Sequence, residues 1–224
     1  MGLFLPTYFP PISQFSEIVR FNEITFEVED NFQKQSYRNR CYIYGANGQQ
    51  MLNIPIQKNN RVEKQKTKDT RVDNNVKWQD QHFKSLKASY NCSPFFEFFE
   101  DDLQRIYNKK YHFLNDLNFD AFLFLTDALQ LEIKTKKTAE YQHHNIENDF
   151  RFLANVKQKT LKKHPPYIQV FSDKHGFLPN LSILDLLFME GPNAISYLYF
   201  LCFFLIFLYF LIIFYINLKK LFIY

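Results

Sequence analysis

Alternating polar and apolar residues in the first third of the chain predict β-strands, because side chains of a strand point to its two faces in turn. Residues 23–29 (Glu-Ile-Thr-Phe-Glu-Val-Glu) alternate strictly and predict a half-buried strand. Residues 40–44 and 50–56 lie on either side of the Asn-Gly pair at 47–48, and this arrangement predicts a hairpin. A further short strand is predicted over residues 167–171.

The middle of the chain has the apolar spacing of helices. The expected helices cover residues 13–20, 76–90, 95–107, 117–131 and 181–188, the last of them ending at a glycine. We therefore expect a mixed α/β fold with a strand-rich N-terminal third and a helical middle and C-terminal part. Residues 1–193 are expected to form a single domain.

Residues 194–224 form a separate hydrophobic tail. Residues 197–216 contain no charged side chain, and twenty residues at helical rise span roughly 30 Å, the thickness of a bilayer core. This pattern predicts a C-terminal transmembrane helix. A second interpretation is an aberrant, frame-shifted terminus, because the tail consists almost entirely of amino acids with A/T-rich codons.

Composition excludes two large classes of nucleotide-binding enzyme. The 224 residues include 27 Phe and 14 Tyr but only 5 Gly. Neither a G-x-G-x-x-G nor a G-x-x-x-x-G-K-[ST] motif occurs, so a Rossmann dehydrogenase and a P-loop NTPase are excluded. No cofactor is expected.

The charge balance and the cysteine spacing limit which partners and which cellular compartment are expected for the protein. The 27 basic and 23 acidic residues are too balanced for general nucleic-acid binding. Cys41, Cys92 and Cys202 lack the spacing of a disulfide framework or a zinc site, and without an H-E-x-x-H motif no metal site is expected. The start of the chain has no signal-peptide pattern. We expect a cytoplasmic domain, with the tail as a candidate anchor to the inner membrane.

The densest polar cluster is residues 33–40, which supply the candidate substrate-binding side chains. These are Gln33, Lys34, Tyr37, Arg38, Asn39 and Arg40. In an extended segment Lys34, Arg38 and Arg40 would share one face and suit a nucleotide diphosphate or sugar phosphate, since guanidinium groups bind phosphate oxygens in pairs. The structural alternative is a strand whose arginines pair with Glu27 and Glu29. The Lys-rich run of residues 57–75 has two similar interpretations, a solvated face or a phosphate patch.

His82 and Asp185 are the candidate catalytic residues. His82 follows Trp78 by one helical turn and could transfer protons near neutral pH, although a histidine beside a tryptophan is more often a packed core residue. Asp185 lies within an apolar helix and needs a partner. The partner would be Arg38 or Arg40, in a structural ion pair, or a substrate hydroxyl or amine.

Seven motifs, in this order and spacing, resemble the WbqC-like protein family. They are Pro6 to Ile12, Phe32 to Cys41, Leu52 to Pro55, Trp78 with His82, Tyr90 with Ser93-Pro94-Phe95, Tyr167-x-Gln169-x-Phe171, and Leu181 to Phe188. The resemblance covers about residues 5–193, and it implies a bacterial protein associated with lipopolysaccharide O-antigen and other surface polysaccharides. Family members normally end soon after the segment matching residues 186–191, so the tail departs from the family pattern.

Two functions of different classes follow. The first is a transferase that adds an N-acyl or aminoacyl group to a nucleotide-linked amino sugar, with the polar cluster holding the phosphate and His82 or Asp185 handling the proton. The second is a non-catalytic accessory or scaffold protein for glycan assembly at the inner membrane. A weaker third interpretation is a nucleotidyltransferase-like fold with residues 6–12 at the nucleotide, although the expected His-x-Gly-His motif is absent.

Overall fold

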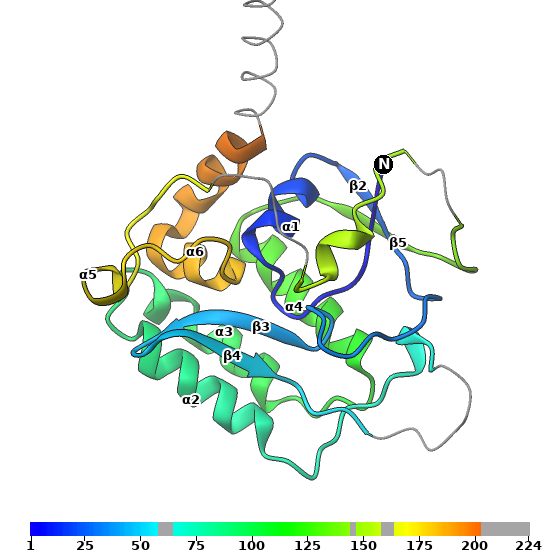
Figure 1. Ribbon diagram of the computed structural model, residues 1–224, viewed down its shortest axis with the longest axis horizontal. Helices are drawn as coiled ribbons and strands as arrows, with labels where there is room; N and C mark the ends of the chain where they lie inside the picture. The colour runs from blue at the N-terminus through cyan, green and yellow to red at the C-terminus, as the bar shows by residue number, and fades with distance from the viewer. Residues whose placement is uncertain (58–64, 144–146, 158–163, 203–224) are drawn as a thin grey trace, which may run out of the picture.

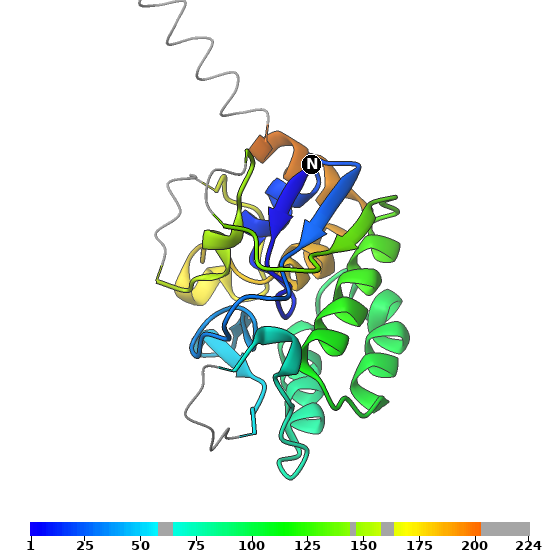
Figure 2. The same cartoon turned by 90° about the vertical axis from the view of Figure 1, so that its right-hand side faces the viewer.

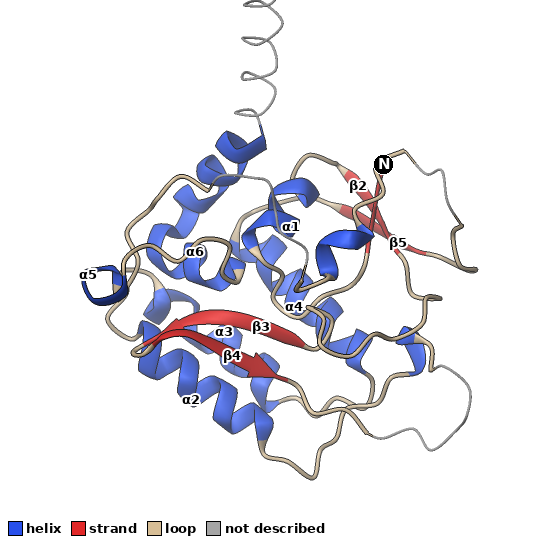
Figure 3. Cartoon of the chain, viewed as in Figure 1, coloured by secondary structure: helices blue, strands red, loops and turns tan. Residues whose placement is uncertain are grey.

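A three-stranded parallel sheet and a separate two-stranded hairpin are covered by helices in the computed structural model (Figures 1 and 3). The structure describes residues 1–57, 65–143, 147–157 and 164–202. The strands are β1 (Gly2–Phe4), β2 (Glu23–Phe26), β3 (Arg40–Gly45), β4 (Gly48–Asn53) and β5 (Lys134–Lys137). The α-helices are α1 (Ile12–Ile18), α2 (Trp78–Tyr90), α3 (Phe96–Asn108), α4 (Leu114–Ala128), α5 (Ser172–His175) and α6 (Ile183–Glu190). Short 3-10 helices are η1 (Thr67–Asp69), η2 (Arg151–Ala154) and η3 (Gly191–Asn193).

The parallel sheet has the order β1-β2-β5 (Figure 2). Strands β1 and β2 are joined through α1, as parallel neighbours require a crossover connection. Strand β5 returns to the sheet only after the hairpin and helices α2 to α4. All three strands run in the same direction, so their carboxyl ends meet at one edge. In open parallel sheets this edge is where ligands bind.

The mixed α/β class expected from the sequence is confirmed, and so is the hairpin. Strands β3 and β4 pair antiparallel with Arg40 opposite Asn53 and Gly45 opposite Gly48. Gly48 has a φ of 95°, a left-handed conformation that glycine adopts without strain. The alternation of residues 40–53 therefore predicted both the strands and their turn.

The expected central helices are also present, and their apolar faces pack into one core. In α3 the buried residues recur at helical spacing, namely Phe96, Phe99, Leu103, Ile106 and Tyr107. Helix α3 contacts α2, α4 and α6, and α6 also contacts β3. Gly191 follows α6 with a φ of 54°, and a Cβ there would lie 2.6 Å from the Phe95 ring. The α6 terminus therefore depends on glycine.

Strands β1 and β5 of the parallel sheet were not predicted from the sequence pattern, and one predicted strand is wrong. β5 is Lys-Thr-Lys-Lys with all four residues exposed, so it shows no apolar alternation. Residues 167–171 form no strand. Instead, the side chains of Tyr167 and Gln169 point to Asp185, while Ile168 between them is exposed. The alternation there reflects side-chain hydrogen bonding rather than strand pairing.

The start of the hydrophobic tail packs against the domain. Residues 194–202 are helical, with Leu198 and Leu201 buried in the core and Cys202 Sγ 2.7 Å from the Ser16 carbonyl oxygen. Within the described residues, no helix combines the length and the apolar character needed to cross a membrane. Most of the predicted transmembrane run, residues 203–216, lies outside the described residues, so that interpretation stays a prediction.

Truncation tests the domain boundary expected after residue 193, which also stays a prediction. We expect residues 1–202 to fold and residues 1–193 to be less stable by roughly 4 kcal/mol, because the buried Leu198 and Leu201 are lost and burying each leucine contributes about 2 kcal/mol. Urea unfolding of the two truncations measures the difference. Equal stability would instead show that the domain is complete at residue 193.

Candidate functional site

A cavity of about 650 Å³ lies at the carboxyl edge of the parallel sheet. One wall comes from the segment after β2 and from the polar cluster, and the other comes from the segment after β5. The lining residues are Leu5, Glu29, Asp30, Asn31, Gln33, Arg38, Lys66, Tyr141, His143, Asp149, Arg151, Phe152 and Asn155. The volume falls in the range of small-molecule sites, and the lining is mostly polar. This cavity is the candidate functional site.

The side chain of Glu27 connects the two walls of the cavity. Its side chain is fully buried, immediately after β2. Oε1 accepts hydrogen bonds from the Thr138 hydroxyl at 2.8 Å and the Glu29 amide at 2.9 Å. Oε2 accepts from the Gln142 amide at 2.9 Å and faces Arg151 Nη1 at 3.5 Å. A buried carboxylate is costly unless it is satisfied, so these donors fix the segments after β2 and β5 relative to each other.

An ion pair between Asp30 and Arg38 forms the first wall. Arg38 is 2% exposed, and its Nη2 donates to Asp30 Oδ2. The Arg38 carbonyl oxygen accepts from Asn118 Nδ2 of α4 at 2.9 Å, which holds the backbone of the wall. Breaking a buried pair by removing one partner leaves an uncompensated charge. The pair is therefore a structural part of the wall as well as a part of the cavity surface.

Lys66 forms the exposed rim of the cavity and pairs with Glu29, to which Lys68 also pairs. Lys66 Nζ and Lys68 Nζ each lie 2.6 Å from a carboxylate oxygen of Glu29. The hydrogen bonds from Lys66 and Lys68 lower the pKa of the Glu29 carboxyl group, so it stays ionised near neutral pH. Because Lys68 also holds Glu29, Lys66 can turn toward a ligand without leaving this carboxylate unpaired. The Lys66 side chain is 47% exposed, which leaves it accessible.

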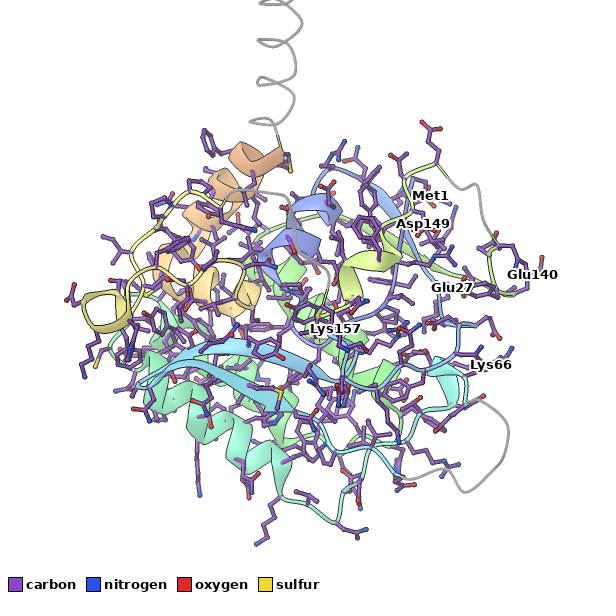
Figure 4. All side chains as sticks on the ribbon, in the orientation of Figure 1. Met1, Glu27, Lys66, Glu140, Asp149 and Lys157 are labelled. Carbon is purple, nitrogen blue, oxygen red and sulfur yellow. The ribbon has the colours of Figure 1, made fainter. Side chains whose placement is uncertain are left out.

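The second wall is organised by Arg151. It donates through Nε to Asp149 Oδ1 at 2.9 Å and through Nη2 to Oδ2 at 2.6 Å. The hydrogen bonds with Asp149 raise the pKa of Arg151. The guanidinium carbon also lies 5.1 Å from the centre of the Tyr141 ring, and the His143 ring contacts the same ring edge-on. Figure 4 shows Asp149, Glu27 and Lys66 on one side of the molecule.

The walls carry little net charge, because every cation in these three groups has a carboxylate partner. The pairs are Arg38 with Asp30, Lys66 and Lys68 with Glu29, and Arg151 with Asp149 and Glu27. Each pair therefore places a hydrogen-bond donor beside an acceptor. Such a surface suits a ligand with many hydroxyl or amine groups better than a bare anion, which would need cations free of other partners.

The predicted extended conformation of residues 33–40 is wrong. The Ser36 hydroxyl donates to the Gln33 carbonyl oxygen at 2.7 Å, and Gln35 has a φ of 58°, so the chain turns before β3 begins. Lys34 is exposed while Arg38 is buried, and the basic side chains do not form one row. Only Gln33 and Arg38 of the six candidates line the cavity.

The other members of the cluster have different surroundings. Tyr37 is largely buried, and its amide donates to the Ala154 carbonyl oxygen at 2.9 Å, tying the two walls together. Burial raises the pKa of the Tyr37 hydroxyl to about 12. Asn39 Nδ2 donates to the Ile54 carbonyl oxygen at 3.1 Å beyond the hairpin. The structural alternative expected the arginines to pair with Glu27 and Glu29. Arg38 instead forms its ion pair with Asp30.

His82 lies in the core and does not line the cavity. Its Nδ1 is 2.9 Å from the Tyr8 hydroxyl, which in turn lies 2.5 Å from the Tyr107 hydroxyl. The Trp78 ring packs edge-on against it. Burial lowers the pKa of His82 to about 4, so the imidazole is neutral at physiological pH. These contacts are those of a hydrogen-bonded core histidine.

Asp185 lies at the centre of a second buried polar cluster. Its carboxylate accepts from the Tyr90 hydroxyl at 2.7 Å, the Tyr167 hydroxyl at 2.5 Å and Gln169 Nε2 at 2.8 Å. The expected arginine partner is therefore replaced by two hydroxyl groups and an amide. Burial raises the pKa of the Asp185 carboxyl group. The cluster joins α6 to α2 and to the segment before α5, outside the cavity.

Sequence reasoning missed most of the second wall. Tyr141, His143, Asp149, Arg151 and Phe152 follow β5, which has no apolar pattern of its own. Without β5 the parallel sheet cannot be predicted, and neither can the edge to which these residues belong. The usable signal was the acidic run that directly follows the apolar residues of β2, because polar residues at a strand end mark the binding edge of a parallel sheet.

The profile of the WbqC-like protein family matches residues 6–162 and 154–197. The chain belongs to this family. The match includes the whole of the cavity apart from Leu5. This WbqC-like chain is also 25% identical over 219 residues to Rv1507c, an uncharacterised protein of Mycobacterium tuberculosis, covering 85% of this chain and 94% of the relative. No solved structure matches the chain.

Arg38→Ala is expected to lower the free energy of unfolding by about 3 kcal/mol, because it leaves Asp30 charged without its buried partner. Lys34→Ala, on the exposed part of the same turn, should change it by less than about 0.5 kcal/mol. The double variant Asp30→Ala/Arg38→Ala should be less costly than the two single effects added together. Urea unfolding gives all three values. An Arg38→Ala effect as small as that of Lys34→Ala would contradict the structural role of the pair.

His82 should make stability depend on pH. The unfolded histidine titrates near pH 6.5 and the folded one near 4, so only the unfolded chain binds this proton between those values. Stability therefore falls as pH is lowered through this window, by about 2 kcal/mol between pH 7 and pH 5, and this contribution levels off as the pH falls below 4.

Urea unfolding at pH 7 and pH 5 measures this difference. His82→Gln should reduce the loss by about 2 kcal/mol, whereas His112→Gln, at an exposed position, should leave it unchanged. The same loss in wild type and His82→Gln would mean that other groups account for the acid sensitivity.

Proposed function

We propose that this WbqC-like protein binds a nucleotide-linked amino sugar at the carboxyl edge of its parallel sheet. The proposed reaction is transfer of an acyl or aminoacyl group from an activated donor to the sugar amine, during assembly of O-antigen or another surface polysaccharide. The observation that carries the proposal is the polar cavity of about 650 Å³ between the two family-matched walls. Its size suits a sugar together with part of its phosphate.

Lys66 is the group best placed to meet the phosphate. It lies at the rim, is half exposed and shares Glu29 with Lys68. Turning Lys66 toward a phosphate oxygen keeps one lysine on Glu29 and adds a charge-assisted hydrogen bond to the ligand. Arg38 and Arg151, by contrast, are already held by carboxylates within the walls.

The proton-transfer role expected of His82 or Asp185 stays a prediction. Both side chains are buried outside the cavity, His82 against Tyr8 and Asp185 against Tyr90 and Tyr167. Among the described residues of the cavity wall, His143 is the imidazole within reach of a ligand. An imidazole is the side chain that most readily exchanges a proton near neutral pH.

The alternative function, a non-catalytic accessory or scaffold protein, is supported by a groove elsewhere on the surface. The groove has a volume of about 550 Å³ and lies between α3 and α4. Phe98 and Leu123 line it and are 78% and 54% exposed. Exposed apolar side chains around a groove are typical of protein interaction sites. The apolar run of residues 197–216 supports membrane attachment of either kind of protein.

A ligand panel distinguishes the two functions. The full chain is titrated calorimetrically with UDP-N-acetylglucosamine, UDP-glucose, GDP-mannose and glucosamine 1-phosphate. We expect at least one to bind, and Lys66→Ala to weaken its binding about tenfold through loss of a charge-assisted hydrogen bond. Lys109→Ala removes a similarly ion-paired and exposed lysine from the α3–α4 groove and should have no effect. Absence of binding by every probe would favour the accessory function.

A further inference from the structure

Two buried atoms of the first wall have no hydrogen-bond partner among the described residues. They are Asp30 Oδ1, an acceptor, and Arg38 Nε, a donor. Asp30 is 8% exposed and Arg38 is 2% exposed, and both line the cavity. Buried polar atoms in proteins are nearly always hydrogen-bonded. Arg38 Nη2 already donates to Asp30 Oδ2, so the ion pair holds the two side chains together. A ligand that carries a donor next to an acceptor can satisfy both atoms.

An aromatic ring on the second wall has a free surface in the same cavity. Phe152 is 50% exposed. The neighbouring Tyr141 is exposed to a similar extent, but the Arg151 guanidinium already lies over its ring and His143 packs against its edge. The Phe152 ring has a looser neighbour, the Phe150 ring, whose centroid is 6.5 Å away, so Phe152 is the better platform for a ligand. Aromatic faces are weakly negative and attract the weakly positive C–H groups of a saturated ring.

We infer that the cavity holds the sugar of the nucleotide sugar, with its ring on Phe152 and two adjacent polar substituents on Asp30 and Arg38. This inference rests on the proposed function and names the part of the ligand that is recognised. A pyranose ring carries polar groups on neighbouring carbons. One of them can donate to Asp30 while the next accepts from Arg38, and the two can be a pair of hydroxyls or an amine and a hydroxyl. The amine is the better donor to the carboxylate because the hydrogen bond is charge-assisted.

The nucleobase fits this cavity less well. Every cation of the walls is ion-paired, and side-chain amides of Gln33, Asn31 and Asn155 add further hydrogen-bonding groups to the lining. The hydroxyl groups around a sugar ring can form hydrogen bonds with these side chains on several sides of the ring at once. A base presents its polar atoms along its edge only. The phosphate would then lie at Lys66, with the nucleoside outside the cavity.

Saturation-transfer NMR on the full chain with the three nucleotide sugars named above tests this placement. We expect the strongest saturation on the sugar-ring protons and weak saturation on the base protons. Phe152→Leu keeps an apolar side chain but removes the ring, and should weaken binding by about five- to tenfold. Phe152→Tyr keeps the ring and should bind within about twofold of wild type. Phe98→Leu is the matched control in the α3–α4 groove and should have no effect.

Asp30→Asn tests the hydrogen-bonding half of the inference, with Asp127→Asn of the α3–α4 groove as its control. We expect Asp30→Asn to weaken binding about tenfold, and melting followed by circular dichroism checks that it is folded. Should Asp30→Asn not fold, the Phe152 pair still decides the result.

The outcomes separate this inference from the proposed function. Nucleotide-sugar binding with saturation on the base, or with equal affinity for Phe152→Leu and Phe152→Tyr, would overturn the placement of the sugar and leave the proposed function standing. Failure of wild type to bind any of the probes would overturn both.

Discussion

The buried carboxylate of Glu27 is the interaction on which the candidate site depends. It follows β2 directly and holds the Thr138 hydroxyl after β5 and the Gln142 amide beyond it. Arg151 then connects the same carboxylate to Asp149. A carboxyl group with no exposure is tolerated only if its oxygens are satisfied. The Glu29 amide is a local donor, but Thr138, Gln142 and Arg151 are each more than 100 residues away, so the requirement of one side chain brings the two cavity walls together.

Ion pairing in the walls has a consequence for ligand choice. Preformed pairs keep the arginines fixed and desolvated before a ligand arrives, and they lower the field that would attract a free anion. A sugar hydroxyl can insert beside such a pair without separating it, whereas a phosphate would have to compete with Asp30 or Asp149. Lys66 is the exception because Glu29 has a second lysine. The charge arrangement thus favours a polar ligand inside and an anionic group at the rim.

The sequence predicted the elements whose stability comes from apolar contacts. The hairpin and helices α2, α3, α4 and α6 were predictable because their buried positions repeat at the period of the element. β5 was not, because its four exposed residues are held by backbone pairing with β2 and by a lysine of β5 on Glu23. The turn at residues 34–39 was missed for a related reason. Its shape is set by the Ser36 hydroxyl and by the Arg38 pair with Asp30, and neither contact leaves a periodic signal.

The residues that the sequence motifs selected are buried, whereas the residues that a ligand can reach are different ones. His82 and Asp185 belong to motifs of the family resemblance, yet each is enclosed by hydrogen bonds to tyrosines, and those clusters join α2 to the rest of the core. A polar residue in an apolar helix needs a hydrogen-bond partner wherever it occurs. The sequence around it therefore looks the same whether that partner is a tyrosine or a substrate. Topology distinguishes the two cases. The residues accessible to a ligand follow β2 and β5 at the edge of the parallel sheet, and that position is defined only when all three strands are in place.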